Sequence, residues 1–472
     1  MRAAFALLAL AACAAPPASP APPRPAAPNV VLLMADDLGW ADVFGPDGGR
    51  PSTPALDRMA AEGLRLRRFY AAAPVCSPTR GSVLTGRHPS RYGIPGANSG
   101  HLPHDELTLA ELLAARGYRT GFFGKWHLGT LTREVHDSNR GGPRGVKHYS
   151  PPWEHGFDVA FATEAKVPTW DPMVKPGTDE PYGTRYWVAP EQAETENLAG
   201  DDSRVIVDRV EPFLRASAAD DAPFLAVIWF HAPHLPLVAG EPYLAQNEAP
   251  GRDYKAVVSA LDHEVGRVRD LLDELGVADD TLVWFASDNG PETRGAPPHE
   301  RPHDQPAEHY AEVELGSAAP FRGRKRSLYE GGVRVPSLVA WPAGLPLASV
   351  GSALDLPLST SDILPTVLAA VGEPAPPRTL DGVALLDELR SGATERPAAS
   401  PGIGFRSGKR AAWSEGRWKL HSSDAGETWE LYDLALDPAE RSDVATEHAA
   451  VAERLAAAWQ AWRDDCVADH GR

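Results

Sequence analysis

Three short apolar runs, each followed directly by polar side chains, constrain the fold of this chain more than any other feature. The runs are Asn29–Ala35, residues 224–230 and residues 281–286. Continuous apolar runs of this length are typical of strands buried on both faces of a parallel sheet. Because sites in open α/β sheets form at the carboxyl ends of the strands, the polar residues that follow the runs should meet in one place. In chain order these residues are Asp36 and Asp37, His231 and His234, and Asp288 and Asn289.

Amphipathic segments between the runs predict helices that would cover the sheet. They span residues 53–63, 108–116 and 254–275. The glycines at their ends are expected to close the helices in the left-handed conformation, and these are Gly63, Gly117 and Gly276. We therefore predict an α/β fold in which a large, mostly parallel central sheet is sandwiched by helices.

A proline-rich break at residues 374–378 divides the predicted domains. With 472 residues, the chain is long enough for one large domain and a smaller one. The large domain is expected to span residues 29–375, and residues 376–472 are expected to form a small C-terminal α+β unit. The elements predicted in that unit are short strands in residues 410–421 and 429–432 and a helix over residues 447–463.

Two segments rich in Gly, Pro, His and charge interrupt the alternation of strands and helices. They span residues 130–152 and 293–319 and are expected to be surface insertions that line the rim of the site. Their histidines match no motif and are expected to be mostly solvated, and these are His136, His148, His299, His303 and His309.

The N-terminal segment predicts export. Arg2 followed by a short apolar run gives residues 1–12 the character of a signal peptide. Cys13 after Leu-Ala-Ala resembles the lipid-modified cysteine of bacterial lipoproteins, with ordinary cleavage near Ala15 as the alternative. The Pro- and Ala-rich residues 13–28 predict an extended tether. We expect a periplasmic or cell-surface protein that is anchored through lipid, or otherwise secreted.

The charge of the chain limits its partners. A formal net charge of -18 argues against binding nucleic acid, which needs clustered Lys and Arg. An anionic substrate would have to be bound by a few cationic side chains and a metal within one pocket.

The most specific motif is CSPTR at residues 76–80, followed by LTG at residues 84–86. Taken alone, it would also fit a buried structural cysteine. The motif resembles the signature of the type I (formylglycine-dependent) sulfatases, arylsulfatase-like enzymes of the alkaline phosphatase superfamily. This resemblance implies that a formylglycine-generating enzyme oxidises Cys76 to formylglycine (3-oxoalanine).

Further motifs extend the resemblance over nearly the whole mature chain. GKWHLG at residues 124–129, PHLP at residues 233–236 and the segment around Lys325 match family elements in order. Two arginines flank Lys325 and leave the identity of that cation open, and His231 is expected to lie behind the catalytic residues. The catalytic residues that the resemblance implies are Cys76, Arg80, Lys125, His127, His234 and Lys325.

The resemblance also implies one bound Ca²⁺. Its expected ligands are Asp36, Asp37, Cys76, Asp288 and Asn289. Oxygen ligands suit a hard cation such as calcium. Without the resemblance, two aspartates after a strand could equally be a helix cap or a solvated turn.

Together these features predict a sulfuric ester hydrolase that acts on a sulfated carbohydrate or on an aryl or alkyl sulfate. In the implied mechanism, one hydroxyl of hydrated formylglycine attacks sulfur, and the other, deprotonated by His127, expels sulfate. Two alternatives stay open: a phosphonate monoester or phosphodiester hydrolase of the same superfamily, and a non-catalytic lipoprotein that binds sulfated glycans. The exact substrate, the oligomeric state and the role of Cys466 are also open.

Overall fold

The computed structural model describes residues 27–46, 49–293, 303–307, 315–400 and 402–470. The predicted signal peptide and nearly all of the predicted tether, including Cys13, lie outside these residues. In the described part of the chain, the largest sheet has ten strands in the order β12-β2-β11-β9-β1-β8-β4-β5-β6-β7. Their bounds are β1 (Asn29–Ala35), β2 (Leu64–Leu66), β4 (Arg119–Lys125), β5 (Val159–Thr163), β6 (Trp187–Ala189), β7 (Gln192–Ala193), β8 (Phe224–Trp229), β9 (Thr281–Ser287), β11 (Ser337–Ala340) and β12 (Ala353–Leu354).

The strands β9, β1, β8, β4 and β5 run parallel in the middle of this sheet. Their carboxyl ends are level, since Ala35 pairs with Ser287, and both Met34 and Gly124 pair with Trp229. The three predicted apolar strands are confirmed as β1, β8 and β9. β11 runs antiparallel between β9 and β2, so the sheet is mixed. Its central strands are parallel, and the prediction of a mostly parallel sheet is confirmed.

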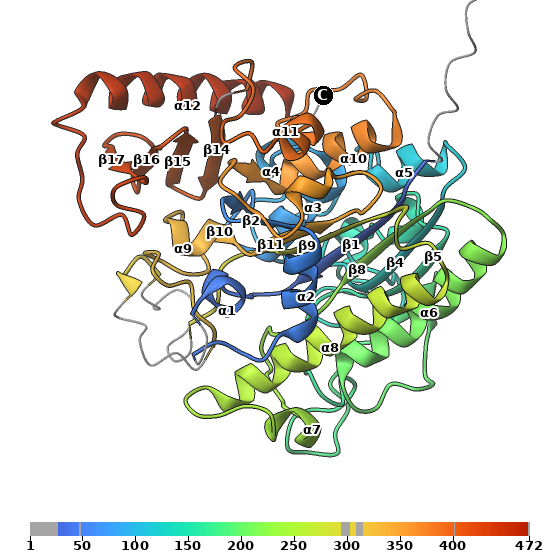
Figure 1. Cartoon of the computed structure of the whole chain (residues 1–472). Coiled ribbons are helices and arrows are strands. Elements are labelled where there is room, and N and C mark those ends of the chain that lie inside the picture. Colours follow the sequence, from blue (N-terminus) through green and yellow to red (C-terminus); the bar gives the residue numbers. More distant parts are fainter. Residues whose placement is uncertain (1–26, 47–48, 294–302, 308–314, 401, 471–472) are drawn as a thin grey trace, which may run out of the picture.

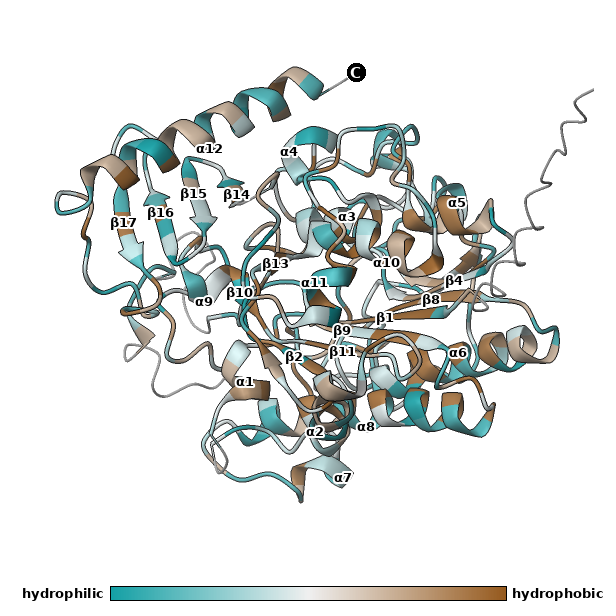
Figure 2. Ribbon diagram, turned by 45° about the horizontal axis from the view of Figure 1, so that its top comes forward, coloured by the Kyte–Doolittle hydropathy of each residue, from teal (hydrophilic) through white to brown (hydrophobic). Residues whose placement is uncertain are grey.

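Alternate side chains of β1 enter two hydrophobic layers on opposite faces of the sheet. Val31 and Leu33 lie in one layer, and Val30 and Leu32 lie in the other. Figure 1 shows the helices on both sides of the strands, and Figure 2 shows that the central strands are hydrophobic. The first layer is covered by α2 (Pro54–Glu62), α6 (Asp202–Ala219) and α8 (Arg252–Glu274), and the second by α3 (Cys76–Thr85), α5 (Leu109–Ala114) and α10 (Ile363–Val371).

The three predicted helices are confirmed as α2, α5 and α8, although α5 is shorter than predicted. Gly117 and Gly276 have the predicted left-handed conformation, with φ of 84° and 69°. The prediction was wrong for Gly63, whose φ is -139°. A Cβ on this residue would lie 2.2 Å from the carbonyl oxygen of Val339, so glycine permits the close approach of β11.

The C-terminal unit is a four-stranded antiparallel sheet packed against one long helix. The predicted small α+β unit is thus confirmed, although its predicted boundaries stay a prediction. The sequence analysis missed the first of its strands, β14. The bounds are β14 (Gly402–Ser407), β15 (Arg410–Glu415), β16 (Trp418–Ser422), β17 (Glu430–Asp433) and α12 (Ala449–Asp469).

A buried ion cluster joins this unit to the large domain. Lys419 Nζ on β16 lies 2.8 Å from Glu330 Oε1 and 3.2 Å from Glu440 Oε1. All three side chains are buried. Removing one partner from such a cluster leaves an uncompensated buried charge.

Lys419→Met is therefore expected to lower the free energy of unfolding by about 3 kcal/mol. Chemical denaturation would measure the change. Lys175→Met is the control, because Lys175 forms an exposed ion pair with Glu180 and its loss should leave the stability unchanged. Equal stabilities of the two variants would contradict the prediction.

The segment of residues 130–152, predicted as a surface insertion, contains both exposed and buried residues. Thr130 and Tyr149 form an isolated parallel bridge, and the buried Asp137 accepts a hydrogen bond from Trp187 Nε1 at 3.1 Å. This part of the chain therefore packs against the domain. Of the unassigned histidines, His136 is exposed, His148 is half-buried and His303 is buried, while His299 and His309 lie outside the described residues.

The other described elements are short. No helix among the described residues is both long enough and apolar enough to cross a bilayer. These elements are α1 (Trp40–Phe44), β3 (Phe69–Tyr70), α4 (Pro89–Tyr92), α7 (Glu241–Leu244), α9 (Glu330–Val333), β10 (Arg334–Val335), β13 (Leu358–Ser359), α11 (Leu386–Ser391) and 3₁₀ turns at Val146–His148, Pro152–Glu154, Leu347–Ser349 and Thr360–Asp362.

Candidate active site

A cavity of about 890 Å³ lies at the carboxyl ends of the central strands. Five of the six predicted catalytic side chains line it, and these are Cys76, Lys125, His127, His234 and Lys325. The sixth, Arg80, is buried together with the oxygen-bearing residues predicted as metal ligands, Asp36, Asp37, Asp288 and Asn289.

Cys76 is the first residue of α3. The turn before it is held by Thr79, whose hydroxyl donates to the carbonyl oxygen of Ala73 at 2.8 Å. A Cβ at Gly81 would lie 2.8 Å from the ring of Tyr92, so the motif requires glycine after its arginine. Burial raises the pKa of the Cys76 thiol, despite the opposing effect of nearby lysines. The unmodified side chain is therefore a protonated thiol, which is a poor nucleophile.

The predicted metal ligands converge beside this cysteine. One side-chain oxygen each of Asp36 and Asp288 and the sulfur of Cys76 lie within 4.8 Å of one another. Asn289 Nδ2 donates to Asp37 Oδ1 at 2.6 Å. Asp36 Oδ1 and Asn289 Oδ1 are buried and have no hydrogen-bond partner among the described residues. Buried oxygens normally have partners, so this set fits a hard cation such as Ca²⁺.

Arg80 lies behind the carboxylates. Its Nε and Nη2 donate to Asp288 Oδ2 at 3.0 and 2.7 Å, and its Nη1 donates to the carbonyl oxygen of Lys125 at 2.9 Å. Burial, followed by the charge of Asp36, raises the pKa of Asp288 to about 7, although Arg80 opposes this shift. Arg80 therefore fixes the position of Asp288 and compensates part of its charge.

Two lysines neutralise the other carboxylates. Lys125 Nζ donates to Asp36 Oδ2, and Lys325 Nζ donates to Asp37 Oδ1 and Oδ2 at 2.6 and 2.8 Å. Together with the Arg80–Asp288 pair, three cationic side chains thus face three carboxylates. A divalent cation bound here would make the group net positive, which suits an anionic substrate.

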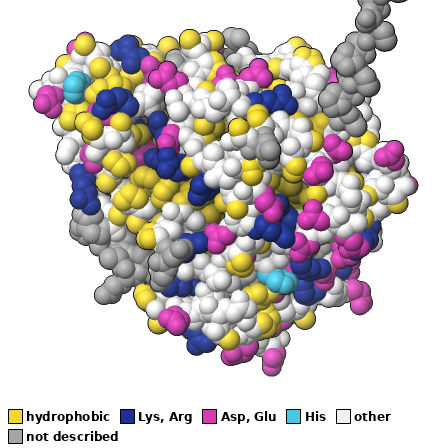
Figure 3. Space-filling view, viewed as in Figure 1, with side chains coloured by type: hydrophobic (Ala, Val, Ile, Leu, Met, Phe, Trp, Pro, Cys, Tyr) yellow, Lys and Arg dark blue, Asp and Glu magenta, His cyan; other side chains and the backbone are white. Residues whose placement is uncertain are grey.

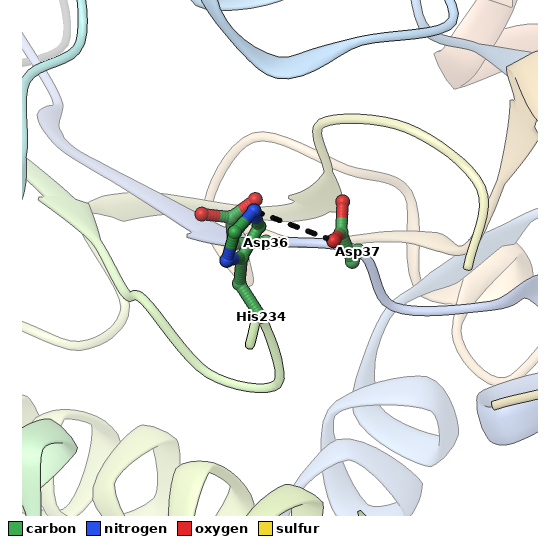
Figure 4. A group of neighbouring side chains, drawn as sticks. All are labelled: Asp36, Asp37 and His234. Atoms are coloured by element: carbon green, nitrogen blue, oxygen red, sulfur yellow. Dashed lines mark ion pairs between the residues drawn. The ribbon is translucent and has the colours of Figure 1, made fainter. Parts of the chain in front are cut away.

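Two histidines complete the cavity wall. His234 Nε2 lies 3.7 Å from Asp37 Oδ2, and Figure 4 shows its ring directed toward both aspartates. Burial lowers the pKa of His234 to about 4. His127 Nε2 is 3.0 Å from Asn98 Oδ1, and burial, followed by Lys125, lowers the pKa of His127 well below its ordinary value. A neutral His127 can accept a proton.

His231 lies apart from these groups, as predicted. It is buried, with Nδ1 2.8 Å from Asp202 Oδ2 and Nε2 2.6 Å from Thr163 Oγ1. Thr163 pairs with Lys125 in the sheet, so His231 supports the strand next to the one that carries the lysine.

The cavity wall also contains residues that the sequence analysis missed. Each of the two predicted insertions contributes a residue to the cavity wall, as expected, and these residues are Asn139 and Asp304. The turn between β14 and β15 lines it as well, although no motif pointed to this part of the C-terminal unit. Arg326, one of the two arginines that flank Lys325, lines the cavity too, and the missed polar residues are Asn98, Lys166, Glu292, Ser407, Lys409, Arg410 and Ser423.

This fold and this set of residues define the class of the protein. The sulfatase family model matches residues 28–373. The chain belongs to the sulfatase family and is an enzyme of the sulfatase class, as predicted.

Individual relatives agree with this assignment. The chain is 33% identical over 436 residues to N-acetylgalactosamine-6-sulfatase of Sus scrofa, with 87% of this chain and 74% of that protein covered. It is 32% identical over 398 residues to arylsulfatase G of Rattus norvegicus, with 77% and 68% covered. The fold is also similar to the crystal structure of Ps i-CgsB in complex with k-i-k-neocarrahexaose, with a TM-score of 0.74, 25% identity and 92% of each chain covered.

Proposed function

We propose that the protein releases inorganic sulfate from a sulfated carbohydrate or from an aryl or alkyl sulfate, using formylglycine at position 76 and one Ca²⁺. The observation that carries this proposal is the position of Cys76, whose sulfur lies within 4.8 Å of carboxylate oxygens of Asp36 and Asp288. The raised pKa of the thiol also favours conversion of this residue over direct thiolate chemistry.

Formylglycine and calcium would supply the nucleophile and a Lewis acid. Hydrated formylglycine would provide a hydroxyl that attacks sulfur, and a calcium ion would stabilise negative charge on the sulfate oxygens. The residues proposed to hold the ion are Asp36, Asp37, Asp288, Asn289 and the modified Cys76.

The side chains of the cavity have separate roles in this proposal. Lys125 and Lys325 attract the sulfate oxygens, and Asp37 and other anions raise the pKa of Lys325 in spite of its burial, which keeps it charged. His127 accepts a proton from position 76. When the sulfur–oxygen ester bond breaks, the leaving alcohol takes a proton from Lys325, or from His234 once that residue has itself gained a proton, since its low pKa leaves the imidazole neutral near pH 7. Arg80 acts through Asp288, which it positions.

A phosphonate monoester or phosphodiester hydrolase is the alternative within the same superfamily. The identity of 33% over 87% of the chain to a named sulfatase favours sulfate esters. Parallel assays with nitrophenyl sulfate, a phosphonate monoester and a phosphodiester test the proposal, using protein co-expressed with a formylglycine-generating enzyme. We expect the highest kcat/KM on the sulfate ester, and a higher value on either phosphorus ester would contradict the proposal.

Removal of calcium should lower turnover strongly. Treatment with a strong calcium chelator is expected to lower kcat by about 10²-fold or more, because the ion would stabilise charge that develops on sulfate. Added Ca²⁺ should restore the rate, while circular dichroism checks that the fold is retained. An unchanged rate in the calcium-depleted protein would refute the metal assignment.

The remaining proposals rest on the sequence. We propose export by the N-terminal signal, with lipid attachment at Cys13, and maturation by a formylglycine-generating enzyme. The alternative of a non-catalytic glycan-binding lipoprotein is disfavoured, because binding alone needs neither a modifiable cysteine nor a neutral histidine beside it.

A further inference from the structure

Cationic side chains extend beyond the proposed catalytic residues along the wall of the same cavity. They come from three distant segments of the chain and are Lys166, Arg326, Lys409 and Arg410. The chain as a whole has a formal net charge of -18. On the face shown in Figure 3, Lys and Arg side chains are interspersed with Asp and Glu side chains. Four cations around one cavity therefore call for a specific explanation.

Two of the four have anionic partners within the protein. Arg326 forms a two-pronged pair with Glu292 at 2.7 and 2.9 Å. Arg410 Nη2 lies 3.2 Å from Asp304 Oδ2. These pairs neutralise both arginines and hold the cavity wall together.

Lys166 differs from these arginines. It follows β5, is half-buried, and forms no hydrogen bond or ion pair with any residue that the structure describes. Burial, followed by the charges of Lys125 and Lys325, lowers its pKa. A partly desolvated ammonium group is stabilised when an anion binds to it.

Lys409 has a fixed backbone and a free side chain. It lies in the turn between β14 and β15, where Gly408 has φ of 58°. Its carbonyl oxygen accepts a hydrogen bond from Ala425 N at 2.6 Å, and the neighbouring Arg410–Asp304 pair fixes the turn against the large domain. Its ammonium group has no ion-pair partner within the described ranges and is exposed at the cavity.

We propose that Lys166 and Lys409 bind anionic groups of the substrate other than the sulfate that is removed. The natural substrate would then be a saccharide with at least two anionic groups, where the additional ones are sulfates or carboxylates. The cavity of about 890 Å³ lies near the upper end of the range of roughly 300–1,000 Å³ typical of small-molecule sites, which leaves room for such a ligand. This inference rests on the proposed function.

The test compares three saccharides that share the same scissile sulfate. One has no other charge, one has a second sulfate and one has a carboxylate. The variants are Lys166→Gln and Lys409→Gln, with Lys→Arg at each position as the charge-preserving variant. Lys175→Gln is the matched control, because Lys175 is exposed, pairs with Glu180 at 2.7 Å and does not line the cavity.

The readout is the ratio of kcat/KM for a doubly anionic substrate to that for the singly anionic one. We expect the wild-type protein to prefer a doubly anionic substrate, and each Lys→Gln change to lower this ratio about tenfold or more, the scale of one charge-assisted hydrogen bond. The Lys→Arg variants should keep the ratio, as should the control. The ratio is measured separately for the substrate with a second sulfate and for the substrate with a carboxylate. The one for which the Lys→Gln variants lower the ratio identifies the group that the lysines recognise.

Two other outcomes are distinguishable. Equal kcat/KM on all three substrates, or unchanged ratios in both Lys→Gln variants, would overturn the inference and leave the proposed sulfatase activity intact. If wild-type protein that contains formylglycine and calcium hydrolysed none of the three substrates, the proposed function would be contradicted. The inference would then fall with it.

Discussion

Cys76→Ser is expected to lose turnover and to keep the fold. A serine has one hydroxyl and no second oxygen with which to release sulfate, so kcat should fall on the order of 10⁴–10⁶-fold, as when a nucleophile is removed. Serine and cysteine are close in size, so the buried start of α3 should be retained. Steady-state kinetics with nitrophenyl sulfate and circular dichroism would measure the two effects.

Cys466→Ser is the matched control for this experiment. Cys466 is buried in α12, with its sulfur 3.8 Å from Asp381 Oδ1, and it does not line the cavity. This variant should keep wild-type turnover. Full activity of Cys76→Ser without conversion to formylglycine would rule out the proposed nucleophile.

Asp288→Ala should damage both activity and stability. The change removes a proposed calcium ligand, so kcat should fall about 10²–10³-fold, as with the loss of other preorganised polar groups. It also removes the carboxylate that Arg80 contacts at 2.7 and 3.0 Å, which leaves a buried guanidinium group undercompensated. The expected loss in the free energy of unfolding is about 3 kcal/mol. Chelator-buffered calcium titrations should show weaker binding.

Asp262→Ala is the control that separates the loss of activity from the loss of stability. Asp262 is also buried, but its carboxylate accepts hydrogen bonds from the backbone N–H groups of Ala55 and Leu56 at 2.9 and 2.8 Å, at the start of α2. Its loss should lower stability and leave the kcat of the folded protein unchanged. If Asp288→Ala behaved in the same way, Asp288 would have only a structural role.

The central strands could be predicted because they are apolar runs bounded by polar residues. β4 could not, since Gly121 and Gly124 interrupt its apolar pattern. The reason for Gly124 is tertiary: a Cβ there would lie 2.0 Å from the carbonyl oxygen of Trp229 on the neighbouring strand. β14 was missed for a similar reason, because Gly402 and Gly404 interrupt its pattern and lie against the rings of Trp413 and Trp462.

The buried part of the site was predictable, and its outer wall was not. The residues next to Cys76 follow strand ends or belong to compact motifs, so their convergence could be expected from the topology of the sheet. Lys166 and Lys409 are single cations in loops without a recognisable pattern. The turn that carries Lys409 reaches the cavity only because the C-terminal sheet docks through long-range contacts such as Arg410–Asp304.

The most direct test of the account is the mass of the tryptic peptide that spans residues 69–80 and contains Cys76. The protein should be expressed with and without a formylglycine-generating enzyme. Conversion of the thiol to the aldehyde lowers the mass by about 18 Da, and the specific activity should rise in proportion to the converted fraction. Fully active protein whose peptide has the mass of unmodified cysteine would contradict the account.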